Sequence, residues 1–127
     1  MYRYMKEIYR AYENGVPVVG PTYISKALGI KKSTAHHMLK NLAEKGYGKY
    51  IERKGFFVNS KGIEEGEKII KKHRLIECFL AETFLLDKEE ACIEAGKIDE
   101  YFGEELIKFI EKKFKYKNCP CGNRIPK

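Results

Sequence analysis

The fold is decided by the stretch from Thr22 to Lys61, which reads TYISKALGIKKSTAHHMLKNLAEKGYGKYIERKGFFVNSK. Residues 22–28 are predicted to form a short helix, and residues 33–46 a second helix, each ended by a glycine. Two aromatic-rich strands are predicted next, over 47–51 and 56–59, with the turn Glu-Arg-Lys-Gly between them. Helix, tight turn, helix and basic hairpin is the order of a winged helix-turn-helix, which places a helix in the DNA major groove. The stretch therefore predicts DNA binding.

The predicted second helix carries polar and basic side chains near its start, where a recognition helix meets base edges and phosphates. Ser33 and Thr34 are placed to cap the helix and to bind a phosphate, and a plain N-cap explains Ser33 equally well. His36 and His37 are placed to reach bases. The predicted DNA-binding residues, including two at the tip of the wing, are Lys31, Lys32, Ser33, Thr34, His36, His37, Lys40, Arg53 and Lys54.

The positive charge of the chain lies in the half that holds this motif. Residues 1–62 contain 12 Lys and Arg against 4 Glu, whereas residues 63–127 contain 13 Lys and Arg against 14 Asp and Glu. A basic domain attracts polyanions and releases their counterions on binding. A Lys-rich, soluble or thermostable chain is the alternative explanation of the bias. The coincidence of charge and motif favours nucleic acid.

Nothing in the sequence predicts a membrane segment or an export signal. No run of about 18 apolar residues is present, and the opening MYRYMKE lacks the apolar core of a signal peptide. We therefore expect a cytoplasmic protein without a membrane partner.

Helical periodicity predicts one helix before the motif and three after it. The first covers residues 2–14 and is followed by an extended link over 16–21. Ser60 is the predicted N-cap of a long helix that runs to about residue 84. Its predicted apolar stripe contains Ile69, Ile76, Leu80 and Phe84, with His73 on the same line.

The spacing of Asp87 and Glu90 predicts a capping box at the start of a helix that reaches about Phe102. A last helix is predicted over residues 104–114, before an irregular tail. The fold class is therefore mainly α. Residues 1–60 are predicted to form a winged helix-turn-helix of three helices and a two-stranded wing, and residues 61–127 an all-α domain.

Four cysteines and a histidine–glutamate pair are candidate metal ligands in the C-terminal half. His73 and Glu77 are four residues apart on one helix, so both side chains lie on the same face. In a reducing cytosol the cysteines are expected to be buried thiols or metal ligands rather than disulfides. The Cys-Pro-Cys segment offers two thiolates to one ion, although Cys-x-Cys is a weaker signal than paired Cys-x-x-Cys. The four cysteines are Cys78, Cys92, Cys119 and Cys121.

Nearly the whole chain resembles the diphtheria toxin repressor and manganese transport regulator family of metal-dependent repressors. The most specific segments are KHRLIE at residues 72–77 and GNRIP at residues 122–126. The resemblance is also carried by Ile8-Tyr9, Ile24, Ala27-Leu28, Ser33-Thr34, Met38 to Leu42, Gly46-Tyr47, Ser60-Lys61-Gly62, Leu86-Asp87 and Glu94-Ala95.

The resemblance implies a homodimer whose C-terminal helical domain dimerises and binds a divalent ion such as Fe(II), Mn(II) or Zn(II). In such proteins the metal orders the first helix and sets the spacing of two recognition helices on a palindromic operator. The length of the chain matches the short form of the family, so a third, SH3-like domain is not expected.

The resemblance assigns two metal sites to different positions of this chain. One corresponds to His73, Glu77 and Cys92, where Cys92 replaces a histidine and favours Zn(II) or Fe(II) over Mn(II). The other corresponds to Arg3, Gly96, Asp99 and Glu100, of which the first two are not usual ligands. Arg3 is instead suited to pair with one of the two carboxylates. A composite site of His73, Glu77 and Cys92 with Cys119 or Cys121 is a further possibility.

Several alternatives remain open at the level of sequence. For His73, a core histidine bonded to Glu77 is as good an explanation as metal ligation, and Cys78 is expected to be a core residue. The regulator could be independent of metal or respond to thiol redox state, because the usual activating site is incomplete. A scaffold protein that uses the winged helix to bind protein disagrees with the basic N-terminal half. No enzyme is expected, because no catalytic motif appears at the required spacing.

Overall fold

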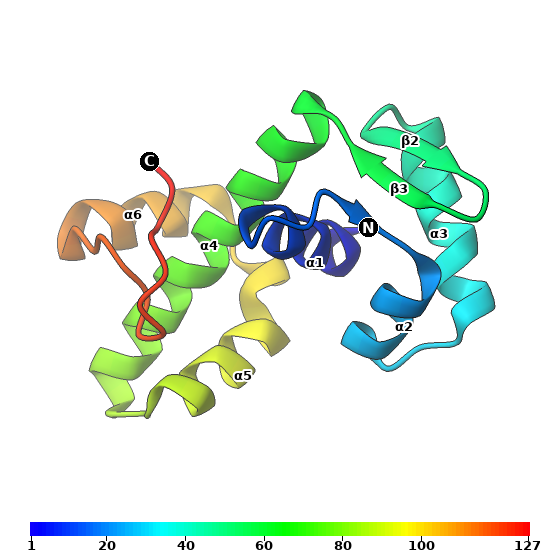
Figure 1. The fold of residues 1–127 in the computed structure, drawn as a ribbon. Coiled ribbons are helices and arrows are strands. Elements are labelled where there is room, and N and C mark those ends of the chain that lie inside the picture. The colour runs from blue at the N-terminus through cyan, green and yellow to red at the C-terminus, as the bar shows by residue number, and fades with distance from the viewer. The chain divides into compact units, whose positions relative to one another are not determined.

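The computed structural model describes residues 1–127 and is mainly helical, as predicted (Figure 1). The chain divides into two compact units, Met1–Glu67 and Lys68–Lys127. None of its helices is long and apolar enough to span a membrane. In chain order the elements are α1 (Tyr2–Glu13), β1 (Val18–Val19), α2 (Pro21–Leu28), α3 (Lys32–Glu44), β2 (Gly48–Ile51), β3 (Gly55–Val58), α4 (Ser60–Phe84), α5 (Lys88–Ile98), the 3₁₀ turn η1 (Asp99–Tyr101) and α6 (Glu104–Phe114).

The N-terminal unit buries one face of each of its first three helices. Pro21 occupies the first turn of α2, and Gly29 ends that helix in the left-handed conformation with φ 65°. Met38, predicted to point inward, is only half-buried. The apolar side chains at the centre of this unit are Met5, Ile8, Ile24, Ala35, Leu39, Leu42 and Phe56. This core holds α2 and α3 as a helix-turn-helix with the hairpin beside α3 (Figure 1).

The sheet has three antiparallel strands in the order β1-β3-β2, so the prediction of two strands was incomplete. The third strand is the valine pair of the expected extended link, and Val19 lies opposite Phe56. Two residues are too few to show the alternation that identifies a strand in sequence. A Cβ at Gly55 would lie 2.6 Å from the Val19 carbonyl oxygen, so the close pairing of β1 and β3 requires glycine there.

Two predicted helix caps were wrong by one or two residues. Helix α3 begins at Lys32 with Lys31 as N-cap and without a side-chain cap hydrogen bond. Ser33 therefore lies in the first turn of the helix and is not its N-cap. At α4 the cap is Asn59 rather than Ser60, because the Gly62 amide donates to Asn59 Oδ1 at 2.9 Å.

In the C-terminal unit the capping box at Asp87 and Glu90 is confirmed. Helix α5 stops at Ile98 and continues only as a 3₁₀ turn, so the predicted helix to Phe102 was too long. Phe84, expected on the buried stripe of α4, is 63% exposed, because it lies in the last turn of the helix. The core combines residues of α4, α5 and α6 with two from the tail: Leu75, Ile76, Cys78, Leu80, Ala91, Ala95, Ile110, Cys119 and Ile125.

Candidate DNA interface and metal centre

The predicted DNA-contacting side chains of α3 and of its N-cap are largely accessible. Lys31, Lys32, Ser33, Thr34, His37 and Lys40 are exposed, and His36 is half-buried. Ala35 and Leu39 are buried on the opposite side of the helix. The helix therefore presents a basic and polar face to solvent while its apolar face packs inward.

The wing is a tight turn with an exposed, charged tip. The Lys54 amide donates to the Ile51 carbonyl at 3.0 Å, and Arg53 adopts a positive φ of 68°. Arg53 and Lys54 are both exposed. Glu52, in the same turn, contacts Lys40 and His36 of α3. Sequence reasoning did not single out Glu52, because only the folded hairpin brings it to the helix.

A buried donor cluster lies on α4 and α5 in the C-terminal unit. His73 Nε2 is 2.8 Å from Glu77 Oε1, one helical turn away. Cys92 Sγ of α5 is 3.6 Å from the same nitrogen. His73 and Glu77 are 1% and 2% exposed, so both polar side chains lie in the interior of the unit. The three ligand atoms lie within 4.8 Å of one another, a separation that one metal ion can bridge.

Asp99 lies on the other side of the same imidazole. Its Oδ2 is 2.7 Å from His73 Nδ1, and Asp99 is itself 2% exposed. A proton on Nδ1 satisfies Asp99 and leaves Nε2 as the ligand atom, the arrangement found at many histidine–metal sites. The predicted core histidine bonded to Glu77 is thus observed as a contact, and the same contact fits a metal site.

The tail brings two further thiols to this cluster. The Cys119 amide donates to the Asn123 carbonyl and the Gly122 amide to the Cys119 carbonyl, each at 2.8 Å, which closes a tight loop. Gly122 has a φ of 90°, a conformation that glycine adopts readily. The Arg74 side chain of α4 donates to the Arg124 carbonyl at 2.6 Å, which attaches the loop to α4. The tail is therefore ordered by backbone hydrogen bonds that its irregular sequence did not reveal.

Glu77 is common to both groups of donors. The Cys121 thiol donates to Glu77 Oε2 at 3.7 Å, and Glu77, Cys119 and Cys121 form a second set of ligand atoms within 4.8 Å of one another. Burial and then the charge of Glu77 raise the pKa of Cys121 to about 11, so the thiol is neutral in the absence of metal. A metal ligand must instead be a thiolate, and its proton is released on binding.

The other candidate residues belong to neither of these two sets of ligand atoms. Glu100 is exposed, and the Lys72 ammonium donates to its backbone carbonyl. A Cβ at Gly96 would meet nothing within 4 Å, and Arg3 donates to the Leu28 carbonyl at 3.4 Å. Cys78 is 6% exposed and donates to the Asn118 carbonyl, and burial raises its pKa to about 12. Cys78 is therefore a core residue, as predicted.

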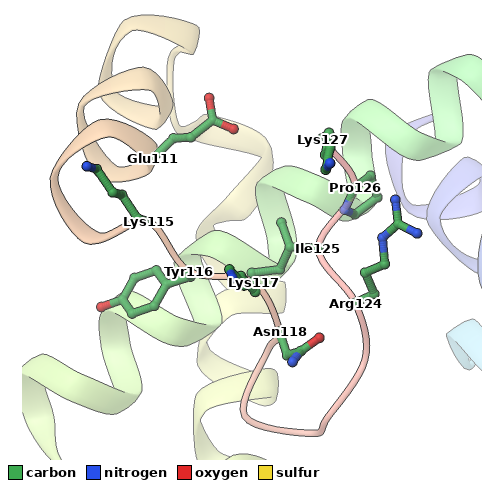
Figure 2. Close-up of a pocket in the computed structure, with 9 residues that line it drawn as sticks. All are labelled: Glu111, Lys115, Tyr116, Lys117, Asn118, Arg124, Ile125, Pro126 and Lys127. Carbon is green, nitrogen blue, oxygen red and sulfur yellow. The ribbon is translucent and has the colours of Figure 1, made fainter.

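A separate cavity of about 630 Å³ lies between the end of α6 and the tail (Figure 2). Asn118 and Arg124 stand on opposite arms of the tail loop. The lining contains one carboxylate, from Glu111, and no histidine or cysteine, so the cavity offers no metal site: Glu111, Lys115, Tyr116, Lys117, Asn118, Arg124, Ile125, Pro126 and Lys127.

Comparison with known proteins matches both halves of the chain to one family. Residues 1–56 match the N-terminal DNA-binding domain of iron-dependent repressors. Residues 59–127 match the metal-binding and dimerisation domain of the same proteins. The chain is also 35% identical over 117 residues to an uncharacterised helix-turn-helix transcriptional regulator of Methanocaldococcus jannaschii, covering 90% of this chain and 94% of that protein.

Solved structures agree with this assignment. The IdeR structure of T. acidophilum is 26% identical with a TM-score of 0.85, covering 98% of this chain and 58% of that one. A hypothetical protein of Sulfolobus solfataricus is 28% identical with a TM-score of 0.75, covering 98% of both chains. A manganese-dependent transcriptional repressor in complex with manganese shares the fold at 24% identity, with a TM-score of 0.91. That match covers 99% of this chain and 58% of that one. The chain thus spans little more than half the length of two of these structures. With both domain matches in chain order, the protein belongs to the iron-dependent repressor family.

Proposed function

We propose that this protein is a transcriptional regulator, a repressor by family type, that binds a palindromic DNA operator as a homodimer. The accessible face of α3 and the wing support DNA contact by Lys31, Lys32, Ser33, Thr34, His36, His37, Lys40, Arg53 and Lys54. The family of the C-terminal half supports dimerisation, and a two-fold dimer matches the symmetry of a palindrome.

We further propose that a divalent transition metal regulates this binding. The observation that carries the proposal is the buried cluster of His73, Glu77 and Cys92 inside a domain of the metal-binding family. These side chains, with Cys121 and Cys119 of the tail, would hold the ion. When bound, the ion supplies a positive charge that offsets the buried carboxylates and links α4, α5 and the tail. Thiolate, imidazole and carboxylate together favour Zn(II) or Fe(II) over Mn(II).

The test is operator binding at fixed salt, first with chelator and then with Fe(II), Mn(II) or Zn(II). We expect one of these ions to raise affinity at least about tenfold, which is about 1.4 kcal/mol of coupling between the two sites. His73→Ala should abolish the rise, whereas Glu100→Gln, which alters an exposed carboxylate nearby, should keep it.

A second candidate is a regulator of the same fold that does not respond to metal in the usual way. It is favoured by Arg3 and Gly96, which occupy positions where the family resemblance expects ligands. Tight operator binding that is indifferent to all three ions would support this candidate. The signal would then be sought in the thiols, by comparing operator affinity before and after oxidation with hydrogen peroxide.

A further inference from the structure

The wing places one acidic side chain against the recognition helix. Glu52 Oε1 lies 3.3 Å from Lys40 Nζ, and its Oε2 lies 3.6 Å from His36 Nε2. The His36 ring also packs edge-on against Tyr50 of β2, with ring centroids 5.2 Å apart. One carboxylate therefore bridges two side chains of the proposed DNA interface.

This carboxylate is ionised at neutral pH. Its hydrogen bond with the Lys40 ammonium, and then the charges of Lys40 and His36, hold the pKa of Glu52 below its usual range. Glu52 is 66% and Lys40 50% exposed, so both can be reached by DNA. The carboxylate oxygen thus occupies a position from which a DNA phosphate oxygen would contact the Lys40 ammonium.

The effect of the Glu52–Lys40 pair on binding affinity differs between unrelated DNA and a cognate site. Binding to DNA of any sequence depends on cations that replace phosphate counterions. The charge of Lys40 is partly offset by Glu52, so Lys40 contributes less to the replacement of phosphate counterions. At a cognate site, hydrogen bonds to base edges add free energy that phosphate contacts do not supply. A carboxylate beside Lys40 therefore lowers the affinity for unrelated DNA more than the affinity for the operator.

We propose that Glu52 is a specificity-determining residue, which withholds Lys40 from phosphates of arbitrary sequence by pairing with it. The inference rests on the DNA binding proposed above. It assigns to the wing a role beyond its basic tip, because the acidic residue of the turn, rather than Arg53 or Lys54, sets the ratio of specific to non-specific affinity.

The test compares Glu52→Gln with Glu64→Gln in the full chain of 127 residues. Glu64 is exposed on the same N-terminal unit. Each variant loses one negative charge, so both raise the net charge by the same amount. The probes are a duplex selected from a random pool by the wild-type protein and a scrambled duplex of the same composition. Thermal unfolding followed by circular dichroism checks that both variants remain folded.

We expect Glu52→Gln to bind the scrambled duplex more tightly at 0.1 M salt, by about 5- to 10-fold for each subunit that gains one phosphate contact. The slope of log affinity against log salt should steepen by about 0.9 per subunit. Affinity for the selected duplex should rise less, so specificity falls. Glu64→Gln should change each affinity less than about twofold, the size of a general charge effect.

A double-mutant cycle with Lys40→Gln tests whether Glu52 acts through Lys40. In that background the gain from Glu52→Gln should shrink, and an undiminished gain would overturn the inference. Equal behaviour of Glu52→Gln and Glu64→Gln would overturn it too, as would weaker operator binding without a gain on the scrambled duplex. Failure of the wild-type protein to retain any duplex would overturn the DNA-binding function itself.

Discussion

At the scale of single residues, the metal cluster was only partly visible in the sequence. The spacing of His73 and Glu77 predicted their contact, because side chains four residues apart share a helical face. The contact of Asp99 with His73 was not predicted, because the family resemblance assigned Asp99 to a different site. The approach of Cys121 to Glu77 depends on the closure of the tail loop, and no local pattern encodes such a long-range contact.

Asp99→Asn should weaken metal binding while the ligands remain in place. The substitution removes the negative charge that accepts the hydrogen bond of His73 Nδ1 and orients the ring, so we expect metal affinity to fall about 10- to 100-fold. Competition between the protein and a chromophoric chelator for Co(II) or Zn(II) measures this. Glu100→Gln removes the same charge one residue away and should change affinity less than about twofold. Equal effects of the two substitutions would contradict an orienting role for Asp99.

At the scale of elements, helix starts were predictable where the signal is local. The capping box of α5 lies within four residues and was predicted correctly. The caps of α3 and α4 were misplaced, because the preceding turn and strand decide where each helix begins. Lys31 and Asn59 hold those positions instead of Ser33 and Ser60.

Acid should weaken the start of α5 through Asp87. The backbone amide of Glu90, followed by its side chain, lowers the pKa of Asp87 below its ordinary value of 3.8. Its folded-state pKa is depressed, so the cap stabilises the fold above the ordinary pKa and is lost as pH falls through the folded value. Asp87→Ala should lower the melting temperature at neutral pH. Asp87→Asn still caps but does not titrate, so it should lose less stability than wild type between about pH 4 and pH 2.

Two glycine-to-alanine substitutions should have opposite effects on stability. A Cβ at Gly62 would lie 2.3 Å from the Tyr47 carbonyl oxygen, so Gly62→Ala should destabilise by about 1–3 kcal/mol. Gly96 in α5 has open space around it, so Gly96→Ala should stabilise by about 0.5–1 kcal/mol. Urea unfolding measures both, and a stabilising Gly62→Ala would show that the wing and α4 are not packed this closely.

At the scale of the whole molecule, charge and apolar surface are unevenly shared between the two units. The composition predicted that the net positive charge belongs to the DNA-binding half. The C-terminal unit leaves large apolar side chains exposed, namely Phe84, Leu85, Ile93, Tyr101, Leu106 and Phe109. Four of them lie on α-helices, where a sequence pattern cannot distinguish exposed residues from core residues, because both follow helical periodicity. Their exposure agrees with the dimerisation role of this domain family.

Phe109→Asp should weaken the proposed dimer. Phe109 is 66% exposed on α6, and a charge placed on a buried apolar interface costs desolvation free energy. We expect the dimer dissociation constant to rise at least about tenfold, which corresponds to about 1.4 kcal/mol, as measured by sedimentation equilibrium. Lys112→Gln, which lowers the net charge by the same single unit at an exposed position of the same helix, is the control. A dimer unaffected by Phe109→Asp would mean that α6 lies outside the interface.

The long helix α4 has a consequence for how the chain can be cut. The boundary between the two units, after Glu67, lies inside this uninterrupted helix rather than in a loop. Trypsin cleaves after lysine and arginine, and Lys68, Lys71 and Lys72 lie just beyond the boundary. Proteases require an extended, locally unfolded segment, so these bonds resist cleavage while the helix is formed. Trypsin should therefore not release the two units as stable fragments, and the rate of cutting at Lys68 reports how often α4 opens.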